Sequence, residues 1–334
     1  MRPATRDSEM QGASTMKTNL RNAAVAAAAA ALALAAVLPA SAADKLKIAI
    51  SQKGLWDTST AYFAAERGFF KAEGLDVSYL FTGGGTETLQ TVMTKSTDIA
   101  TGTGILGVIG AYGKGAKLSI IRSEILGAPE AFWIVKADSK IKSAKDFDGK
   151  QVAFSRPGST THLIVLTMAK KFGVKPTLVS TGAISASRIQ LMSGQIDVSY
   201  SIPPFNIDLV KSGAARVAFR ATELPELQQQ TIRVNVAHQD LSPEIVTRFN
   251  RAYEKTLAWM YDKPEESAAA YAAYAKVPVD IAREVPAYYP RATLEKRELV
   301  GLDRNVADAI TAKFIKAPLT AKQEAELVRI PAAN

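Results

Sequence analysis

Five short segments rich in glycine and hydroxyl side chains stand where predicted strands end and predicted helices begin. One of them, SRPGSTTH at residues 155–162, follows the strand-like KQVAF and precedes the helix-like LIVLTMAKKFG. Backbone N–H groups in the first turn of a helix have no partner within that helix, so a helix start can bind an anion. The segments could therefore be catalytic, could cradle a phosphate, or could hold a small molecule without changing it.

The five segments supply the candidate ligand-binding residues. In chain order they are Gly54, Trp56, Asp57 and Thr58; Gly84, Gly85 and Thr86; Thr101 and Thr103; Ser159, Thr160, Thr161 and His162; and Tyr200 and Phe205. Each segment alone also fits local capping or turn formation, with Trp56 as a packed loop aromatic, Asp57 as an N-cap and His162 as a supporting residue. Because all five follow strands, we expect them to converge on one cleft.

The residues that catalysis most often uses are scarce in this chain. There is no cysteine, and the two histidines, His162 and His238, are far apart in sequence. Gly102, Gly104 and Gly107 spell G-x-G-x-x-G, but on the third predicted strand, whereas a dinucleotide fold carries that fingerprint on its first strand. The sequence thus indicates a protein that is not an enzyme, with no metal site and no cofactor.

The charge balance is mildly basic. The chain has 41 Lys and Arg residues against 32 Asp and Glu residues, a formal net charge of +9. The lysines between residues 136 and 150 are interleaved with aspartates and have no accompanying aromatic stripe, which is typical of a solvated face. We expect no nucleic-acid partner.

Residues 1–42 read as an extension followed by a cleaved export signal. Lys17 and Arg21 give a basic start, residues 23–38 form an apolar run dominated by alanine, and an A-x-A pattern precedes Ala43. Met16 is the more natural start of this signal. The run is shorter than the roughly 20 apolar residues of a spanning helix, so we expect cleavage and a mature monomer that does not span the membrane.

The chain from residue 45 alternates strand and helix patterns, and the alternation restarts after residue 136. Such alternation predicts an α/β fold in which mainly parallel sheets are flanked by helices. Residues 83–100 also align without gaps on residues 182–199, with Gly, Thr or Ser, Met and Asp at matching positions. We expect two lobes of like fold that face one hinged cleft.

The last third of the sequence is helical. Ser242 and Thr320 are predicted N-caps, and Pro243 is predicted at the first helical position. We expect these helices to pack back on the first lobe. The expected boundaries are therefore 43–133 with 234–334 for the first lobe and 134–233 for the second.

The stretch AYFAAERGFFKAEGLDVSYLFTGGG from residue 61 resembles the nitrate, sulfonate, taurine and thiamine-pyrimidine-precursor group of ABC-transporter substrate-binding proteins. DFDGKQVAFSRPGSTTHLIV and LMSGQIDVSYSIPPF are similar to the second lobe of the same group. The resemblance implies a type II periplasmic-binding-protein fold and a periplasmic protein that delivers a solute to an ABC permease with its ATPase. The absence of a lipid-anchoring cysteine fits a Gram-negative periplasm.

The sequence indicates the class of ligand less directly than it indicates the fold. Among the five segments the one arginine is Arg156, so no bidentate clamp is evident. We expect a small organic anion such as a sulfonate or taurine, held by hydroxyl and N–H groups; nitrate, an aromatic carboxylate or a pyrimidine stacked on Trp56 or Tyr200 stays open. Two other functions also stay open: an enzyme of this fold that acts on a small aromatic or pyrimidine compound, and a partner that presents its ligand to a sensor.

Overall fold

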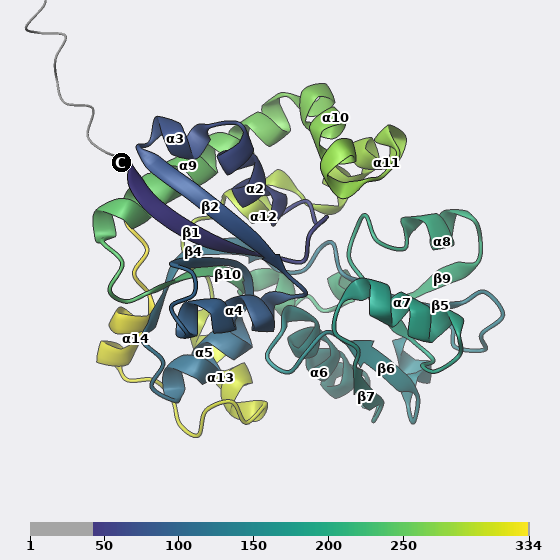
Figure 1. Ribbon diagram of the computed structural model, residues 1–334. Helices are drawn as coiled ribbons and strands as arrows, with labels where there is room; N and C mark the ends of the chain where they lie inside the picture. The colour runs from purple at the N-terminus through teal and green to yellow at the C-terminus, as the bar shows by residue number, and fades with distance from the viewer. Residues whose placement is uncertain (1–42, 333–334) are drawn as a thin grey trace, which may run out of the picture. The chain divides into compact units, whose positions relative to one another are not determined.

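A twisted five-stranded sheet forms the centre of the first lobe in the computed structural model, which describes residues 43–332 (Figure 1). Its strand order is β2-β1-β3-β10-β4. The strands are β1 (Asp44–Ser51), β2 (Leu75–Thr82), β3 (Ile99–Gly104), β4 (Leu118–Leu126) and β10 (Thr231–His238). β10 runs antiparallel to both of its neighbours, and β1 is parallel to β2 and β3. The sheet is therefore mainly parallel, as the alternation of elements predicts.

The second lobe repeats this order with shorter strands. β8-β5-β9 form one antiparallel set, and β6 pairs with β7 in parallel. The strands are β5 (Phe132–Lys136), β6 (Gln151–Phe154), β7 (Thr177–Ser180), β8 (Ser199–Ser201) and β9 (Ala215–Arg220). A parallel bridge between Val152 and Val198, with the Ala153 N–H donating to the Val198 carbonyl at 2.8 Å, joins the two sets. The order becomes β7-β6-β8-β5-β9, in which β5 corresponds to β10.

Helices cover both sheets. In the first two thirds of the chain they are α2 (Ser59–Glu66), α3 (Phe69–Ala72), α4 (Gly85–Met93), α5 (Ile105–Gly113), α6 (Thr160–Phe172), α7 (Ile184–Met192) and α8 (Ile207–Lys211). In the last third they are α9 (Pro243–Asp262), α10 (Pro264–Ala275), α11 (Val279–Glu284), α12 (Arg291–Glu295), α13 (Leu302–Thr311) and α14 (Ala321–Leu327). Short 3-10 turns are η1 (Ala144–Phe147), η2 (Ala221–Glu223), η3 (Leu227–Gln229) and η4 (Val285–Tyr288). None of these helices is long and apolar enough to cross a membrane.

The caps predicted for the C-terminal helices are present. The Ser242 hydroxyl accepts from the Glu244 N–H at 3.2 Å, and Pro243 is the first residue of α9. The Thr320 hydroxyl accepts from the Gln323 N–H at 3.3 Å. α9 packs against α2 and α3, α13 against α5, and α14 against β4. All four partners belong to the first lobe.

The chain passes between the sheets in two segments, residues 127–131 and 221–230. The expected boundaries at 133/134 and 233/234 fall inside β5 and β10. Within the described residues β5 pairs only with strands of the second sheet, and β10 only with strands of the first. We therefore propose these two segments as the hinge. The predicted export signal, residues 1–42, lies outside the described residues.

The packing of α9 on the first lobe can be tested by substitution. Phe249 is fully buried and stacks on Phe70, with ring centroids 5.5 Å apart. Phe249→Ala should lower the free energy of unfolding by about 3–5 kcal/mol because it leaves a cavity in the core. The control Ile189→Ala removes a side chain that is 68% exposed on α7 and should change it by less than about 0.5 kcal/mol. Urea unfolding measures both, and equal small effects would contradict this packing.

Candidate functional site

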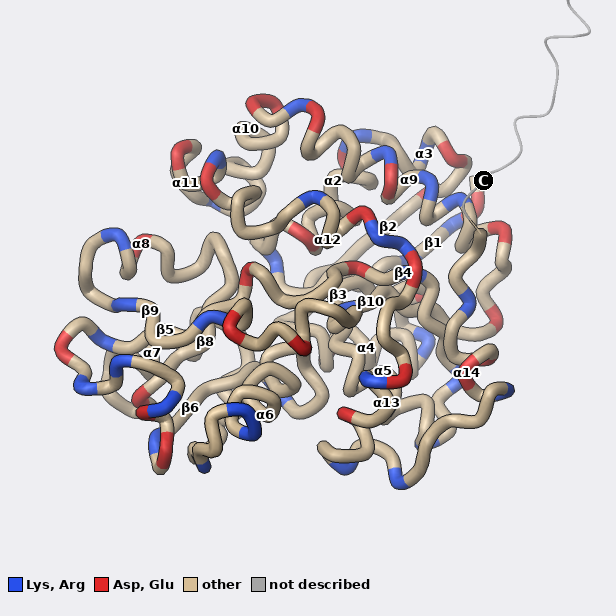
Figure 2. The backbone as a smooth tube through the Cα atoms, turned by 180° about the vertical axis from the view of Figure 1, so that it is seen from behind, with Lys and Arg blue, Asp and Glu red and all other residues tan. Residues whose placement is uncertain are grey.

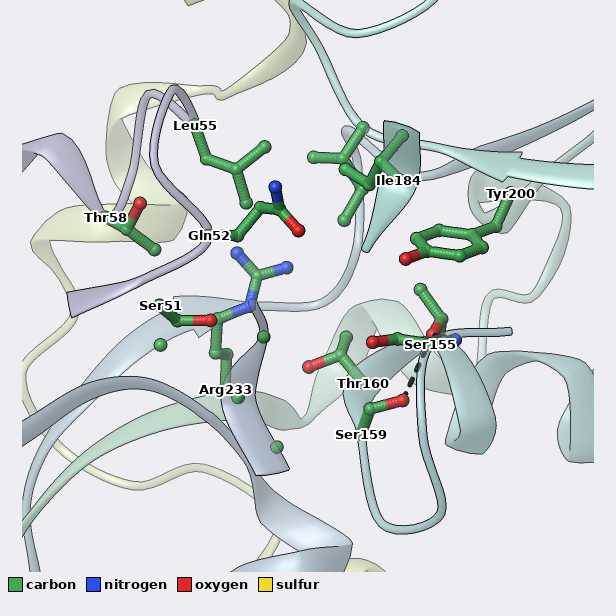
Figure 3. A pocket seen from close by; sticks show the side chains of 16 residues that line it. Ser51, Gln52, Leu55, Thr58, Ser155, Ser159, Thr160, Ile184, Tyr200 and Arg233 are labelled. Atoms are coloured by element: carbon green, nitrogen blue, oxygen red, sulfur yellow. Dashed lines mark hydrogen bonds between the residues drawn. The ribbon is translucent and has the colours of Figure 1, made fainter. Parts of the chain in front are cut away.

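A small cavity lies where the loops of the two lobes meet (Figure 3). Its volume is about 40 Å³, which is room for a few water-sized groups. It is lined by Ser51, Gln52, Leu55, Thr58, Gly84, Gly85, Gly102, Gly104 and Arg233 from the first lobe, and by Ser155, Ser159, Thr160, Thr161, Ile184, Tyr200 and Ile202 from the second. The lining is therefore polar at the loops, with an apolar part formed by Leu55, Ile184 and Ile202.

Five helices begin at this cavity. The residues that cap or open α2, α4, α5, α6 and α7 are among its lining residues, namely Thr58, Gly84, Gly104, Ser159 and Ile184. The first N–H groups of a helix have no acceptor within it, and the helix dipole makes its start electropositive. The arrangement therefore favours a ligand with negative charge or several acceptor oxygens.

Glycine allows the two lobes to approach each other closely. A Cβ on Gly104 would lie 2.6 Å from the Gly158 carbonyl oxygen and 2.7 Å from the Thr160 nitrogen, both in the second lobe. The Gly107 N–H donates across the cleft to the Gly158 carbonyl at 3.0 Å. The structure thus has its lobes in contact at the cleft.

Two further contacts join the lobes beside the cavity. The Thr86 hydroxyl donates to the Pro157 carbonyl at 3.1 Å. Glu87 and Arg156 form an ion pair at 3.6 Å, with both side chains partly exposed. An exposed ion pair contributes little to stability, so backbone contact and hydrogen bonding carry most of this junction.

Hydroxyl groups of the segment 155–162, which leads into α6, have local hydrogen-bond partners. The Ser159 hydroxyl caps α6 by accepting from the His162 N–H at 3.2 Å. The Thr161 hydroxyl accepts from the Ser155 N–H at 2.9 Å. In contrast, the Thr58 hydroxyl is buried at the cavity with no hydrogen-bond partner among the described residues. A buried hydroxyl without a partner is costly, so the Thr58 hydroxyl is a candidate hydrogen-bonding group for a ligand.

Tyr200 lies at the second-lobe side of the cavity, with its hydroxyl oxygen toward the cavity centre (Figure 3). Its hydroxyl donates to the Gly182 carbonyl. Burial raises the pKa of Tyr200 above its usual value, so the phenol stays neutral at physiological pH. Tyr200 therefore gives the cavity a neutral aromatic wall.

The cation at the cavity is Arg233, which the sequence analysis did not select. Most Lys, Arg, Asp and Glu residues lie on outer loops and helices (Figure 2). Arg233, in contrast, lies near the start of β10 and is only 3% exposed. Its guanidinium points toward Gln52 (Figure 3). It forms ion pairs with Asp57 and, at 2.8 Å, with Glu130, both fully buried. Arg233 thus places a buried positive charge in the lining.

A third buried acid, Glu124, contacts the cavity lining. Glu124 accepts a hydrogen bond from the N–H of Gly102, a lining residue. Burial raises the pKa of Glu124 to about 8, and burial likewise raises that of Glu130 to about 8. Desolvation disfavours the charged form of each acid, whereas the guanidinium of Arg233, 2.8 Å from Glu130, favours the ionised form of that residue.

Seven of the predicted site residues line the cavity: Thr58, Gly84, Gly85, Ser159, Thr160, Thr161 and Tyr200. Trp56 does not, because it is fully buried, donates to the Tyr261 hydroxyl at 3.2 Å and packs edge-on against Tyr271. Asp57 is neither a side-chain cap nor a lining residue; it pairs with Arg233. Thr86 is used in the interlobe hydrogen bond instead.

The other predicted residues support the loops. Gly54 is held by hydroxyls of α10, donating to Tyr274 at 3.2 Å and accepting from Tyr271 at 2.6 Å, and Phe205 lies against it. Thr101 and Thr103 are buried in β3 and donate to carbonyls of neighbouring strands at 3.4 and 2.6 Å.

His162 lies behind the loop that precedes α6. It stacks on Phe154, and its Nδ1 accepts from the Gly158 N–H at 3.2 Å. Burial lowers the pKa of His162, which keeps this acceptor unprotonated near neutral pH. Whether any of the predicted residues contacts a ligand stays a prediction.

Sequence reasoning missed nine lining residues: Ser51, Gln52, Leu55, Gly102, Gly104, Ser155, Ile184, Ile202 and Arg233. Most of them lie within two or three residues of a predicted one, so wider loops would have included them. Arg233 had a different signal, since it is the one charged residue between Thr231 and Ala237 in an otherwise uncharged strand pattern. An isolated charge in a buried strand needs a partner or a ligand. Within residues 43–332 no group of three His, Cys, Asp or Glu side chains could hold a metal ion.

The order of the strands, the two lobes and the cleft between them define the fold of the type II periplasmic binding proteins. A protein-family model with the description NMT1/THI5 like matches residues 57–267. The chain belongs to the NMT1/THI5-like family. Comparison with curated proteins gives no match.

Solved structures with the same fold include three binding proteins. The alkanesulfonate-binding protein SsuA of Xanthomonas axonopodis pv. citri, bound to MOPS, has a TM-score of 0.71 and 16% identity over 86% of this chain and 98% of its own. The periplasmic aliphatic sulphonate-binding protein SsuA of Escherichia coli has a TM-score of 0.66 and 19% identity over 84% of this chain and 91% of its own. The periplasmic nitrate-binding protein NrtA of Synechocystis PCC 6803 has a TM-score of 0.66 and 13% identity over 85% of this chain and 86% of its own. The family match and this fold confirm the resemblance inferred from the sequence.

The close approach at Gly104 yields a test that needs no ligand. Gly104→Ala should push the Gly158 loop away, because the new Cβ would meet backbone atoms at 2.6–2.8 Å. The amide of Gly107, which donates across the cleft, should then exchange its hydrogen at least about tenfold faster. Gly83→Ala is the matched control, since its Cβ would meet only the ends of the flexible Glu87 and Arg156 side chains and no backbone atom. Hydrogen exchange followed by NMR measures both variants, and unchanged protection in Gly104→Ala would contradict contact between the lobes here.

Proposed function

We propose that this protein is the solute-binding component of an ABC importer and captures a small organic anion, of the sulfonate or taurine type, between its lobes. The observation that carries the proposal is the convergence of five helix starts and the buried Arg233 on one cavity between the lobes. Helix starts and a guanidinium both favour a compact anion with several oxygen acceptors. The residues of the cavity hold the solute; no chemical step is proposed.

The energetics fit an anion held by several weak contacts. Each helix start contributes about 0.3–1 kcal/mol when exposed and up to about 2 kcal/mol when partly buried. A micromolar dissociation constant requires about 8 kcal/mol. A charge-assisted hydrogen bond from Arg233 adds about 1.5–3 kcal/mol, and lining hydroxyls such as Thr58 and Thr160 add more. Helix dipoles alone are therefore insufficient, and the arginine accounts for a large part of the difference.

The lining of the cavity supports a small anion with a short apolar tail, and a flat ring stacked on Tyr200 is a competitor in the test below. A volume of about 40 Å³ suits a head group of a few atoms with a short tail against Leu55, Ile184 and Ile202. Stacking of an aromatic ligand on Trp56 is disfavoured because Trp56 is fully buried in the core. Nitrate and the head group of a carboxylate are compatible with the same lining and are competitors in the test below.

Transport follows from closure of the lobes around the solute. The ligand stabilises the closed state to the extent that it binds this state better than the open one. We infer that the closed protein delivers the solute to a membrane permease with its ATPase, and that the protein works as a monomer in a Gram-negative periplasm. The sulfonate-binding and nitrate-binding proteins that share the fold support this role.

The hydroxyl of Thr58 provides the sharpest test of the site. Thr58→Val keeps the side-chain shape and removes a buried hydroxyl that has no partner among the described residues, so stability without ligand should be unchanged or higher. The dissociation constant of the bound anion should rise roughly tenfold to a hundredfold, because one hydrogen bond to a charged group is lost. Thermal unfolding with methanesulfonate, ethanesulfonate, taurine, nitrate, benzoate and a pyrimidine identifies the ligand, and calorimetry gives its affinity.

The matched control is Thr103→Val, also on a predicted site residue. The Thr103 hydroxyl donates to the Val234 carbonyl at 2.6 Å within the sheet and does not line the cavity. This variant should lose about 1 kcal/mol of stability and bind the anion as wild type does. A panel in which no compound raises the unfolding midpoint would contradict the proposed function, since a ligand at a hundredfold excess over its Kd stabilises by about 2.7 kcal/mol.

A further inference from the structure

Gln52 brings a side-chain amide into the cavity lining. Among the residues that line the cavity it is the one amide, Arg233 is the one cation, and there is no Asp or Glu. In Figure 3 the amide of Gln52 points into the cavity, between the guanidinium of Arg233 and the side chains of Leu55 and Ile184. Gln52 therefore lies where the part of the cavity that suits an anionic head group meets the part that suits an apolar tail.

The protein leaves the amide of Gln52 available. The amide is half-buried at the cavity and makes no hydrogen bond with another described residue. The backbone of the same residue is bonded at both of its polar groups: its N–H donates to the Thr82 carbonyl at 3.1 Å, and its carbonyl accepts from the Leu55 N–H at 3.4 Å. Because polar groups that lose water on binding need a new partner, this amide needs one from the ligand.

The loop holds Gln52 in a backbone conformation that a glutamine seldom adopts. Its φ is 44°, in the left-handed region, where the Cβ of an L-residue crowds the following carbonyl oxygen. The hydrogen bonds of Gly54 with Tyr271 and Tyr274 of α10 fix the loop in this form. Such strain persists where surrounding contacts determine the backbone. The loop therefore presents the Gln52 side chain to the cavity before a ligand binds.

A hydroxyl group on the ligand suits this amide better than an ammonium or a methyl group. An amide can donate and accept, and so can a hydroxyl, so the two can pair whichever way the amide is turned. An ammonium removed from water needs a carboxylate, but Asp57 and Glu130 pair with Arg233 and do not line the cavity. A methyl group would leave the amide without a partner.

We propose that Gln52 is a specificity-determining residue that selects a short hydroxyalkanesulfonate. The sulfonate group contacts Arg233 and the helix starts, and the hydroxyl at the other end of the ligand pairs with the Gln52 amide. This inference rests on the proposed function and names the substrate class of the same site. Of three sulfonates with two carbons, 2-hydroxyethanesulfonate should bind best, ahead of ethanesulfonate and taurine.

Calorimetry at pH 7 with these three sulfonates tests the role of Gln52. Wild type should bind 2-hydroxyethanesulfonate at least about tenfold more tightly than the other two, because a site that hydrogen-bonds a hydroxyl rejects the analogue that lacks it. Gln52→Met keeps the length of the side chain and its unbranched Cβ but loses the amide. Its Kd for 2-hydroxyethanesulfonate should rise at least about tenfold, whereas that for ethanesulfonate should change less than about threefold. Without ligand it should unfold within about 2 °C of wild type.

Gln90→Met is the matched control. It makes the same chemical change at an exposed position of α4 that does not line the cavity, so it should keep the wild-type order of affinities. Equal affinities for 2-hydroxyethanesulfonate and ethanesulfonate in wild type, or a preference that persists in Gln52→Met, would overturn the role of Gln52 and leave anion binding intact. Tighter binding of taurine than of 2-hydroxyethanesulfonate would overturn the hydroxyl class. Failure of every anion of the panel to bind wild type would contradict the proposed function together with this inference.

Discussion

The burial of Arg233 is the constraint on which the site depends. A guanidinium removed from water needs a counter-charge and hydrogen bonds, and loss of one partner of a buried pair costs several kcal/mol. Its partners come from distant parts of the chain: Asp57 from the loop after β1 and Glu130 from the first crossing between the lobes. Arg233 itself is the third residue of β10, close to the end of the second crossing. The same group of contacts thus joins the loop after β1, the first crossing and the start of β10, and places charged side chains beside the cavity.

The topology explains why helix starts face one another across the cleft. In the first sheet β1 leads through α2 to β2 on one side, while β3 lies on the other; in the second sheet β6 stands in the same relation to β7 and β8. A crevice forms at the carboxyl ends of strands where the chain changes direction in this way. Two such crevices facing each other bring α2, α4 and α5 opposite α6 and α7. Gly104, where no Cβ fits, permits the final approach.

The predictions that succeeded rest on local chemistry or on the periodicity of the pattern. Alternating strands and helices predicted the mixed α/β fold, and Ser159, Ser242 and Thr320 cap the helices that follow them. Four of the glycine and hydroxyl segments identified helix starts at the cavity, those of α2, α4, α5 and α6, whereas the start of α7 at Ile184 was not among them. Within each segment, however, a side chain can point to the cavity or to the core, and a residue type alone does not decide between the two. Trp56 is buried against aromatic residues some 200 positions later, whereas Thr58, two residues away, lines the cavity.

The sequence by itself determined the elements, their caps and the five loops, because capping and amphipathic periodicity depend on residues a few positions apart. Only the tertiary structure decided which side chains share the cavity and what charge they bring. Asp57, Glu130 and Arg233 are separated by as many as 176 positions and meet only when both crossings are in place. The charge of a buried acid depends on desolvation and on neighbours from other elements, so Glu130 gains its properties from the fold and not from its own segment.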